Sequence, residues 1–150
     1  MDKTLCVAKQ LDQMYYERFG EPMDPAKMQK LMYFANRESL MYRDLPLFRE
    51  NFRGWKYGPV LLSVRKAYQA QKERPFADVN GTVCDETKHY LKDVLDRYGN
   101  LSSWKLSCLS HGELSWKMAR RGLNPSENGD VKLSPNLLRV DAKRELERRA

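Results

Sequence analysis

The 150-residue chain has few of the residues on which metal sites and disulfide scaffolds depend. It contains three cysteines and two histidines. Cys6, Cys84 and Cys108 lie far apart, show no Cys-x-x-Cys spacing and leave an odd thiol. Neither His89 nor His111 has a second ligand at the spacing that a structural zinc site needs. We therefore expect reduced thiols, no metal and no other cofactor.

A long apolar run is also absent. No stretch approaches the roughly 18 apolar residues of a membrane-spanning helix. The polar N-terminus, residues 1–7, does not resemble a secretory signal. These absences predict a cytoplasmic protein without a membrane partner. Apolar residues still make up 41% of the chain, and a chain of this length can bury one real core without disulfides or metal.

The sequence lacks the motifs of several enzyme classes. It has no G-x-x-x-x-G-K-[ST] or G-x-G-x-x-G phosphate loop and no G-x-S-x-G nucleophile elbow. Cys108, His111 and Glu113 are close in sequence, but such proximity rarely places side chains for catalysis. We expect His111 to make a capping or core-edge hydrogen bond. The sequence thus predicts a protein that is not an enzyme and has no catalytic residues.

Helical periodicity dominates what is present. It predicts a mainly α fold of six to seven helices in a single domain spanning residues 1–150. The helix after Asp24 is apolar around so much of its circumference that we expect it to be central. Residues 123–150 are expected to form a loop and a peripheral helix with a thin apolar stripe. The expected helices cover residues 5–18, 25–42, 59–71, 85–98, 102–109, 115–122 and 135–150.

One segment interrupts the helical pattern. Residues 45–58 contain glycines, a proline and several aromatic side chains, and residues 51–57 could form a short strand. Residues 131–133 are the candidate partner strand. The pattern therefore predicts at most one small β-ribbon, built from 51–57 and 131–133.

The charge of the chain is positive and unevenly distributed. The net charge is +7, and residues 43–74 hold eight basic residues against three acidic ones. Such a segment can favour nucleic acid or an acidic protein surface. The other interpretation is a solvated surface with dispersed charges, because no basic run is longer than two residues.

Nucleic-acid binding through residues 49–66 is the alternative function. Cations and aromatic rings alternate there, as in sites that combine phosphate contacts with base stacking. Equally, the aromatic residues could form the core while the cations point outward. No convincing helix-turn-helix is present. The cations are Arg49, Arg53, Lys56, Arg65 and Lys66, and the aromatic residues are Phe48, Phe52, Trp55 and Tyr57.

Several short motifs occur in a distinctive order. A helical segment at 27–35 reads Lys-Met-Gln-Lys-Leu-Met-Tyr-Phe-Ala, and it is followed by Pro-Leu-Phe at 46–48 and Gly-Trp-Lys-Tyr-Gly-Pro-Val at 54–60. Leu-Ser-His at 109–111 and Trp116 come later. Together these motifs resemble the Panacea domain of SocA-like antitoxins over roughly residues 5–121. The chain departs from the family pattern in having Ser110 before the histidine and Ser115 before the tryptophan.

The resemblance implies a mainly α domain that binds and inhibits a toxin protein encoded nearby on a bacterial or prophage genome. In the SocA branch the antitoxin is also an adaptor that presents its toxin to a cytoplasmic protease. A phage-encoded member without a toxin could bind another host or phage protein. Trp55 and Trp116 are expected to be either core residues or interface anchors. The motif and candidate partner-binding residues are Lys30, Tyr33, Phe48, Trp55, Lys56, Tyr57, Gly58, Pro59, His111 and Trp116.

Overall fold

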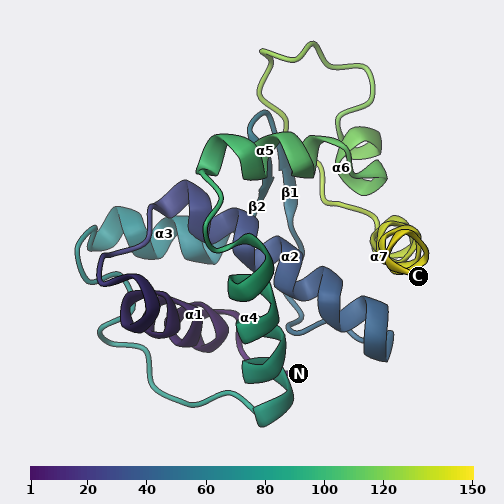
Figure 1. The fold of residues 1–150 in the computed structure, drawn as a ribbon. Helices are drawn as coiled ribbons and strands as arrows, with labels where there is room; N and C mark the ends of the chain where they lie inside the picture. The colour runs from purple at the N-terminus through teal and green to yellow at the C-terminus, as the bar shows by residue number, and fades with distance from the viewer.

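The computed structural model describes residues 1–150 and contains seven helices and one two-stranded antiparallel sheet. α2 runs through the middle of the molecule, with α1, α3 and α4 to one side and α6 and α7 to the other (Figure 1). None of the helices has the length and apolarity that crossing a bilayer requires. The elements are α1 (Thr4–Phe19), α2 (Pro25–Arg43), β1 (Arg53–Trp55), β2 (Gly58–Val60), α3 (Leu62–Ala70), α4 (Asp85–Tyr98), α5 (Ser103–His111), α6 (Leu114–Ala119) and α7 (Pro135–Arg149).

Short polar side chains set the starts of three helices. Asp24, Ser102 and Ser134 precede α2, α5 and α7, and each accepts a hydrogen bond from the backbone N–H three residues later. Proline follows the cap in α2 and α7, where its missing N–H costs nothing. The mainly α prediction and most helix positions are therefore confirmed.

Two helix starts differ from expectation. The helix predicted from Pro59 begins only at Leu62, because residues 58–60 form β2. Ser115, expected as a cap, lies inside α6, and Glu113 occupies the cap position. In both places the backbone N–H groups find tertiary partners, which residue propensities do not reveal.

The predicted ribbon exists, but its main strand partner is different. β1 pairs with β2, in the register Arg53 opposite Val60. The expected partner, residues 131–133, lies on the other edge of β1 and makes one isolated bridge, between Arg53 and Lys132. The Gly54 N–H also donates to the carbonyl oxygen of Val131 at 2.8 Å. We call β1, β2 and the turn between them, residues 53–60, the hairpin.

α2 is buried on all sides, as its apolar circumference predicted. Every residue from Met28 to Met41 is buried, because α2 contacts α1, α3, α4, α5, α7 and β2. Its apolar side chains belong to a core of 30 residues. Six polar or charged side chains are buried with them: Gln29, Lys30, Asn36, Arg37, Glu38 and Ser39.

Three of these six side chains hold the loops that flank the hairpin. Gln29 accepts from the N–H of Leu61 at 2.8 Å and donates to its carbonyl oxygen at 3.1 Å. Asn36 accepts from the N–H of Leu47 at 2.9 Å, and Ser39 donates to a carbonyl oxygen of the same loop. Because an unpaired buried polar group is costly, these bonds fix the chain on both sides of the hairpin.

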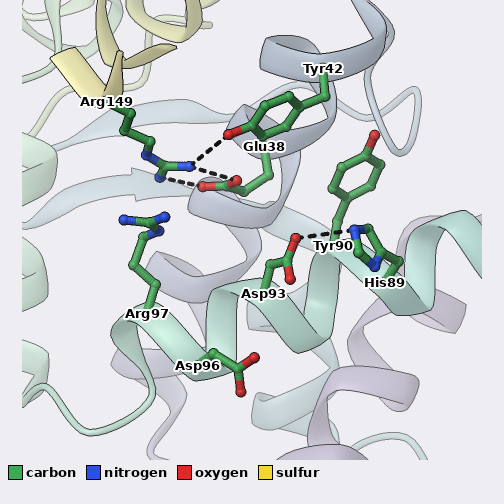
Figure 2. Close-up of a pocket in the computed structure, with 8 residues that line it drawn as sticks. All are labelled: Glu38, Tyr42, His89, Tyr90, Asp93, Asp96, Arg97 and Arg149. Atoms are coloured by element: carbon green, nitrogen blue, oxygen red, sulfur yellow. Dashed lines mark hydrogen bonds and ion pairs between the residues drawn. The ribbon is translucent and has the colours of Figure 1, made fainter. Parts of the chain in front are cut away.

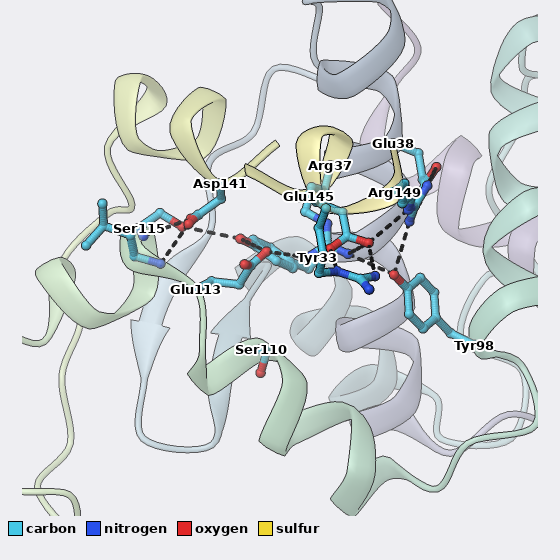
Figure 3. Close-up of polar contacts among 12 residues, drawn as sticks. Tyr33, Arg37, Glu38, Tyr98, Ser110, Glu113, Ser115, Asp141, Glu145 and Arg149 are labelled. Carbon is cyan, nitrogen blue, oxygen red and sulfur yellow. Dashed lines mark hydrogen bonds and ion pairs between the residues drawn. The ribbon is translucent and has the colours of Figure 1, made fainter. Parts of the chain in front are cut away.

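Arg37 forms the centre of a buried polar cluster (Figure 3). Its guanidinium donates to Glu113 at 2.7 Å and to the hydroxyl of Tyr98 at 2.8 Å. The Tyr33 hydroxyl donates to the same Glu113 carboxylate at 3.1 Å. Burial raises the pKa of Glu113, although Arg37 opposes this rise. The cluster connects α2 to α4 and to the start of α6.

Polar contacts also attach one face of α7 to α2, while most of the helix stays outside the core. Arg149 pairs with the buried Glu38 at 2.6 Å and with Glu145 at 2.8 Å. The carboxylate of Asp141 accepts from the backbone N–H groups of Leu114 and Ser115 at 2.7 and 2.8 Å. The thin apolar stripe in the sequence did not predict these contacts, because charged side chains make many of them.

We predict that Arg37→Met lowers the free energy of unfolding by about 3–5 kcal/mol, because the buried Glu113 loses its ion-pair partner. Urea denaturation at pH 7 measures the change. The control is Arg18→Met, which removes a surface pair with Asp96 and should cost less than about 1 kcal/mol. Equal losses in the two variants would contradict a structural role for the cluster.

Candidate partner-binding site

A hollow of about 540 Å³ lies between the first half of α2, the hairpin and α3. We call it the hairpin hollow. None of the 13 residues that line it is acidic. Its cationic and aromatic lining residues are Lys30, Trp55, Lys56, Tyr57, Arg65, Tyr68 and Lys72. Cations and rings therefore define its chemistry.

Two cations of the hairpin hollow lie over its aromatic rings. The guanidinium of Arg65 lies 4.7 Å from the centre of the Trp55 ring, and the ammonium of Lys56 lies 5.2 Å from the Tyr57 ring. Cation–π contacts of this length hold a flexible cation in place while leaving its other side open. Tyr57 is 68% exposed, so it is available to a partner.

The two later motif elements, His111 and Trp116, hold the hairpin in place: Trp116 bonds to it and His111 stacks on Trp116. The indole Nε1 of Trp116 donates to the carbonyl oxygen of Trp55 at 2.7 Å. The His111 ring stacks on Trp116, with centroids 4.1 Å apart and planes within 3°. Trp55 and Trp116 are both half-buried, and the guanidinium of Arg120 lies 5.5 Å from the Trp116 ring.

His111 lies at the edge of the core, where it hydrogen-bonds the backbone of Tyr57. Its Nε2 is buried without a partner, and the ring contributes by stacking. Burial lowers the pKa of His111, and the nearby cations Lys30 and Arg120 lower it further, although the backbone of Tyr57 counteracts them.

Lys30 comes close to the hairpin beneath Gly58. Gly58 has a φ of +125°, and a Cβ there would lie 2.8 Å from both Cε of Lys30 and Oγ of Ser110. Glycine is therefore needed for its backbone conformation and for the close approach of the two side chains. This contact explains why Lys30, Gly58 and Ser110, which are distant in sequence, form one structural unit.

The Lys30 side chain is almost entirely buried, and its ammonium is unpaired. The residue is 3% exposed, and burial lowers its pKa to about 8, with Asp24 opposing the shift. No hydrogen bond or ion pair joins its Nζ to any group in the chain, although it lines the hairpin hollow. A cation in this state is poised to accept an anion.

Besides Lys30 and Gly58, three of the predicted site residues are buried, and none of these three lines the hairpin hollow. Tyr33 and Phe48 are 1% and 2% exposed, and Pro59 is buried in β2. Tyr33 belongs to the Arg37 cluster, and Phe48 packs on Phe52 with ring centroids 5.8 Å apart. Their motif positions therefore reflect packing, and in this fold they are not accessible to a partner.

Of the five cations considered for nucleic acid, only Lys56 and Arg65 line the hairpin hollow. Arg53 is engaged with Asp130 at 3.5 Å, and Arg49 and Lys66 are exposed elsewhere. Of the four aromatic residues considered with them, Phe48 and Phe52 are core residues. The cations of residues 49–66 therefore lie on different surfaces of the protein and do not form one continuous nucleic-acid-binding groove.

A second hollow, of about 580 Å³, lies between α2, α4 and the end of α7 (Figure 2). Its charges are largely paired within the chain: Glu38 with Arg149, and His89 with Asp93 at 3.3 Å. Its lining contains no serine, cysteine or lysine that could act as a nucleophile. No group of three or more histidine, cysteine or acidic side chains in the structure is placed to hold a metal ion.

Sequence patterns did not identify Tyr68, Lys72 and Trp104 as surface groups of interest. Tyr68 and Lys72 line the hairpin hollow from α3 and the residues after it, and Trp104 on α5 is 77% exposed. α5 also reaches the hairpin, since Ser107 donates to the Tyr57 carbonyl oxygen at 3.2 Å. An exposed tryptophan in a weakly amphipathic helix was the one available signal.

Comparison with known proteins gives one finding. A family model described as "Antitoxin SocA-like, Panacea domain" matches residues 28–117, more than half of the chain. No curated protein and no solved structure matches the chain. The matched segment contains α2, the hairpin, α3, α4 and α5, and thus most of the hairpin hollow.

We predict that Lys30→Met raises stability at pH 7 by up to about 3 kcal/mol, because folding disfavours the charged form of a lysine whose pKa falls from 10.5 to about 8. Below pH 8 the penalty is present in full. Between pH 8 and 10.5 only the unfolded chain keeps the proton, so the wild type gains stability and the difference shrinks. Urea denaturation across pH 6–10.5 tests this, with the exposed Lys143→Met as control. A constant difference over this range would contradict it.

We predict that Gly58→Ala lowers the free energy of unfolding by more than the matched change Gly20→Ala. Both glycines have positive φ, but a Cβ at Gly20 meets nothing within 4 Å. Gly20→Ala should therefore cost only the roughly 1–2 kcal/mol of a left-handed alanine, whereas Gly58→Ala must also displace Lys30 or Ser110. Thermal and urea unfolding compare the two, and equal losses would show that the contact beneath Gly58 is unimportant.

Proposed function

This chain belongs to the SocA-like Panacea antitoxin family, and from that premise we propose that it binds a toxin protein encoded nearby and neutralises it by forming a stoichiometric complex. An antitoxin of this kind occludes the active surface of its partner or holds the partner inactive. It therefore needs an accessible, chemically distinctive surface and no active site of its own.

The observation that carries this proposal is the hairpin hollow itself. The segment matched by the family model places Lys30, Trp55, Lys56 and Tyr57 around one surface cavity. Aromatic side chains and arginine are enriched at the energetic centres of protein interfaces. Tyr57 and Arg65 are exposed beside the half-buried Trp55. Such a surface suits tight binding of another protein.

The buried polar groups favour binding over catalysis. Tyr33, Arg37 and Glu113 form a cluster in the interior, where they connect helices. In the second hollow, Glu38 pairs with Arg149 and Asp96 pairs with Arg18 and Lys92, while Asp93 contacts the His89 ring. We therefore propose that the protein is not an enzyme and that its action is stoichiometric.

The setting of this function follows the family. We propose that the protein and its toxin act in the cytoplasm and that their genes lie together, on a bacterial or prophage genome. A protease-adaptor role, as in the SocA branch, stays a prediction for this chain. So does the alternative of a phage-encoded member that binds a different host or phage protein.

Nucleic-acid binding is the second candidate function. It is supported by the mixture of cations and rings in the hairpin hollow, where Arg65 lies over Trp55. It is weakened by the ion pair that engages Arg53 and by the burial of Phe48 and Phe52. It predicts an affinity that falls steeply between about 50 and 200 mM salt.

We predict that co-expression with the product of the neighbouring gene restores growth that this product alone arrests, and that the two proteins co-purify at a fixed ratio. Growth curves and size-exclusion chromatography measure the two effects. The chain expressed with an unrelated toxin is the control. Failure of both rescue and co-purification would overturn the proposed function.

We predict that Tyr57→Ala weakens the complex about 10-fold or more, as expected when an exposed aromatic anchor is truncated. Tyr16→Ala is the matched control, because Tyr16 is also an exposed tyrosine, at 58%, but lies on α1 outside the hairpin hollow. Titration calorimetry of the purified pair measures both affinities. If both variants bound like the wild type, the hairpin would not be the interface.

A further inference from the structure

Lys30 is the exception among the buried polar side chains of α2. Gln29, Asn36, Arg37, Glu38 and Ser39 each make at least one hydrogen bond through the side chain. Lys30 is as buried as these, at 3% exposed, but makes none. An ammonium in the interior without a partner is costly. The Lys30 ammonium on the central helix can therefore bind an anion strongly, and no group of the chain occupies it.

The free ammonium belongs to the wall of a cavity. Lys30 lines the hairpin hollow together with the cations Lys56, Arg65 and Lys72, and no acid lines it. The nearest acidic influence is Asp24, which affects Lys30 through space while its carboxylate accepts from the backbone N–H of Lys27 at 3.3 Å. The hollow is thus a cationic site without an anion.

The walls of the hollow determine what kind of anion fits. Trp55, Tyr57 and Tyr68 supply aromatic surface around the ammonium, and the Tyr68 hydroxyl is buried without a hydrogen-bond partner. The stem of Lys30 lies beneath Gly58, and the residue as a whole is only 3% exposed. A carboxylate on a short apolar stem satisfies both features, because the stem contacts the rings and the carboxylate reaches the lysine.

A nucleic-acid strand fits less well. A phosphodiester chain is held by cations that follow an exposed groove, whereas Lys30 is almost fully buried. Arg49 and Lys66, which could extend such a groove, do not line the hollow. The depth of the cation and the aromatic walls therefore favour a protein side chain.

We propose that the hairpin hollow is a carboxylate-binding site that receives an acidic side chain from the partner protein, with the Lys30 ammonium as its direct contact and the Trp55 and Tyr57 rings beside its stem. Lys56, Arg65 and Lys72 attract the acidic segment to the hollow. Lys30 then recognises a single glutamate or aspartate within it. The identification of the ligand as a protein segment rests on the proposed function.

The test uses defined probes and the full chain. A fluorescein-labelled peptide of four Gly-Glu repeats is titrated against the wild type at low salt and pH 7, next to the matching Gly-Gln peptide and a labelled eight-nucleotide oligothymidylate. We expect the Gly-Glu peptide to bind with a Kd below about 1 mM and to shift the Trp55 indole N–H resonance. The Gly-Gln peptide should not bind.

Two lysine variants separate recognition from general attraction. Lys30→Met should weaken binding of the Gly-Glu peptide about 10-fold or more, because a charge-assisted hydrogen bond is lost. Lys143→Met removes the same charge from the exposed face of α7 and should change the affinity less than twofold. Circular dichroism confirms that both variants are folded. Comparable affinities of the wild type and Lys30→Met would overturn the proposal, as would the absence of binding.

The remaining outcomes are equally decisive. Tighter binding of the oligothymidylate, lost in Lys30→Met, would replace the carboxylate site with a nucleic-acid site. Peptide binding that depends on Lys30, together with failure of the toxin co-expression, would leave the site standing and remove the antitoxin role. Toxin rescue unaffected by Lys30→Met would leave neutralisation standing and place it on another surface.

Discussion

The burial of α2 on every side is the constraint on which the rest of the structure depends. A helix surrounded by five other helices and a strand cannot direct its polar side chains to water. Each of them must find a partner within the protein or impose a cost of several kcal/mol. Gln29 and Asn36 meet this demand by binding the backbone at both ends of the hairpin segment. The position of the hairpin is therefore a consequence of polar groups on α2.

Further along α2, buried charged side chains meet the same need for a partner by forming ion pairs. Arg37 and Glu38 recruit Glu113 and Arg149, and these bring the start of α6 and the end of α7 onto the central helix. Asp141 then completes the arrangement by capping the first turn of α6 with two backbone hydrogen bonds. Contacts of this kind are specific in direction, so they fix how the helices lie as well as whether they associate.

Lys30 is the exception on α2, because its side chain has no hydrogen-bond or ion-pair partner within the protein. The fold buries the stem of Lys30 beneath Gly58 without supplying an acceptor for its ammonium. A group that lowers stability in the free protein can contribute to binding when the partner supplies what is missing, which is a common relation between stability and function. The rings of Trp55 and Tyr57 stand at the same place, so the family motifs around 30 and 54–60 meet at one surface. The segment matched by the family model thus includes most of the residues that line the hollow.

The sequence by itself determined the helices and the family. Helix periodicity and caps such as Asp24 and Ser102 act over three or four residues, and the ordered motifs from Lys27 to Trp116 are visible without a structure. It did not determine which aromatic residues of the hairpin region are buried: Phe48 and Phe52 lie in the core, whereas Tyr57 is exposed. It also missed how α7 attaches to α2, because Glu38 and Arg149 are separated by 111 residues. Only the tertiary structure decided these points, since the burial and pairing of a side chain depend on neighbours that are distant along the chain, and local patterns carry no information about them.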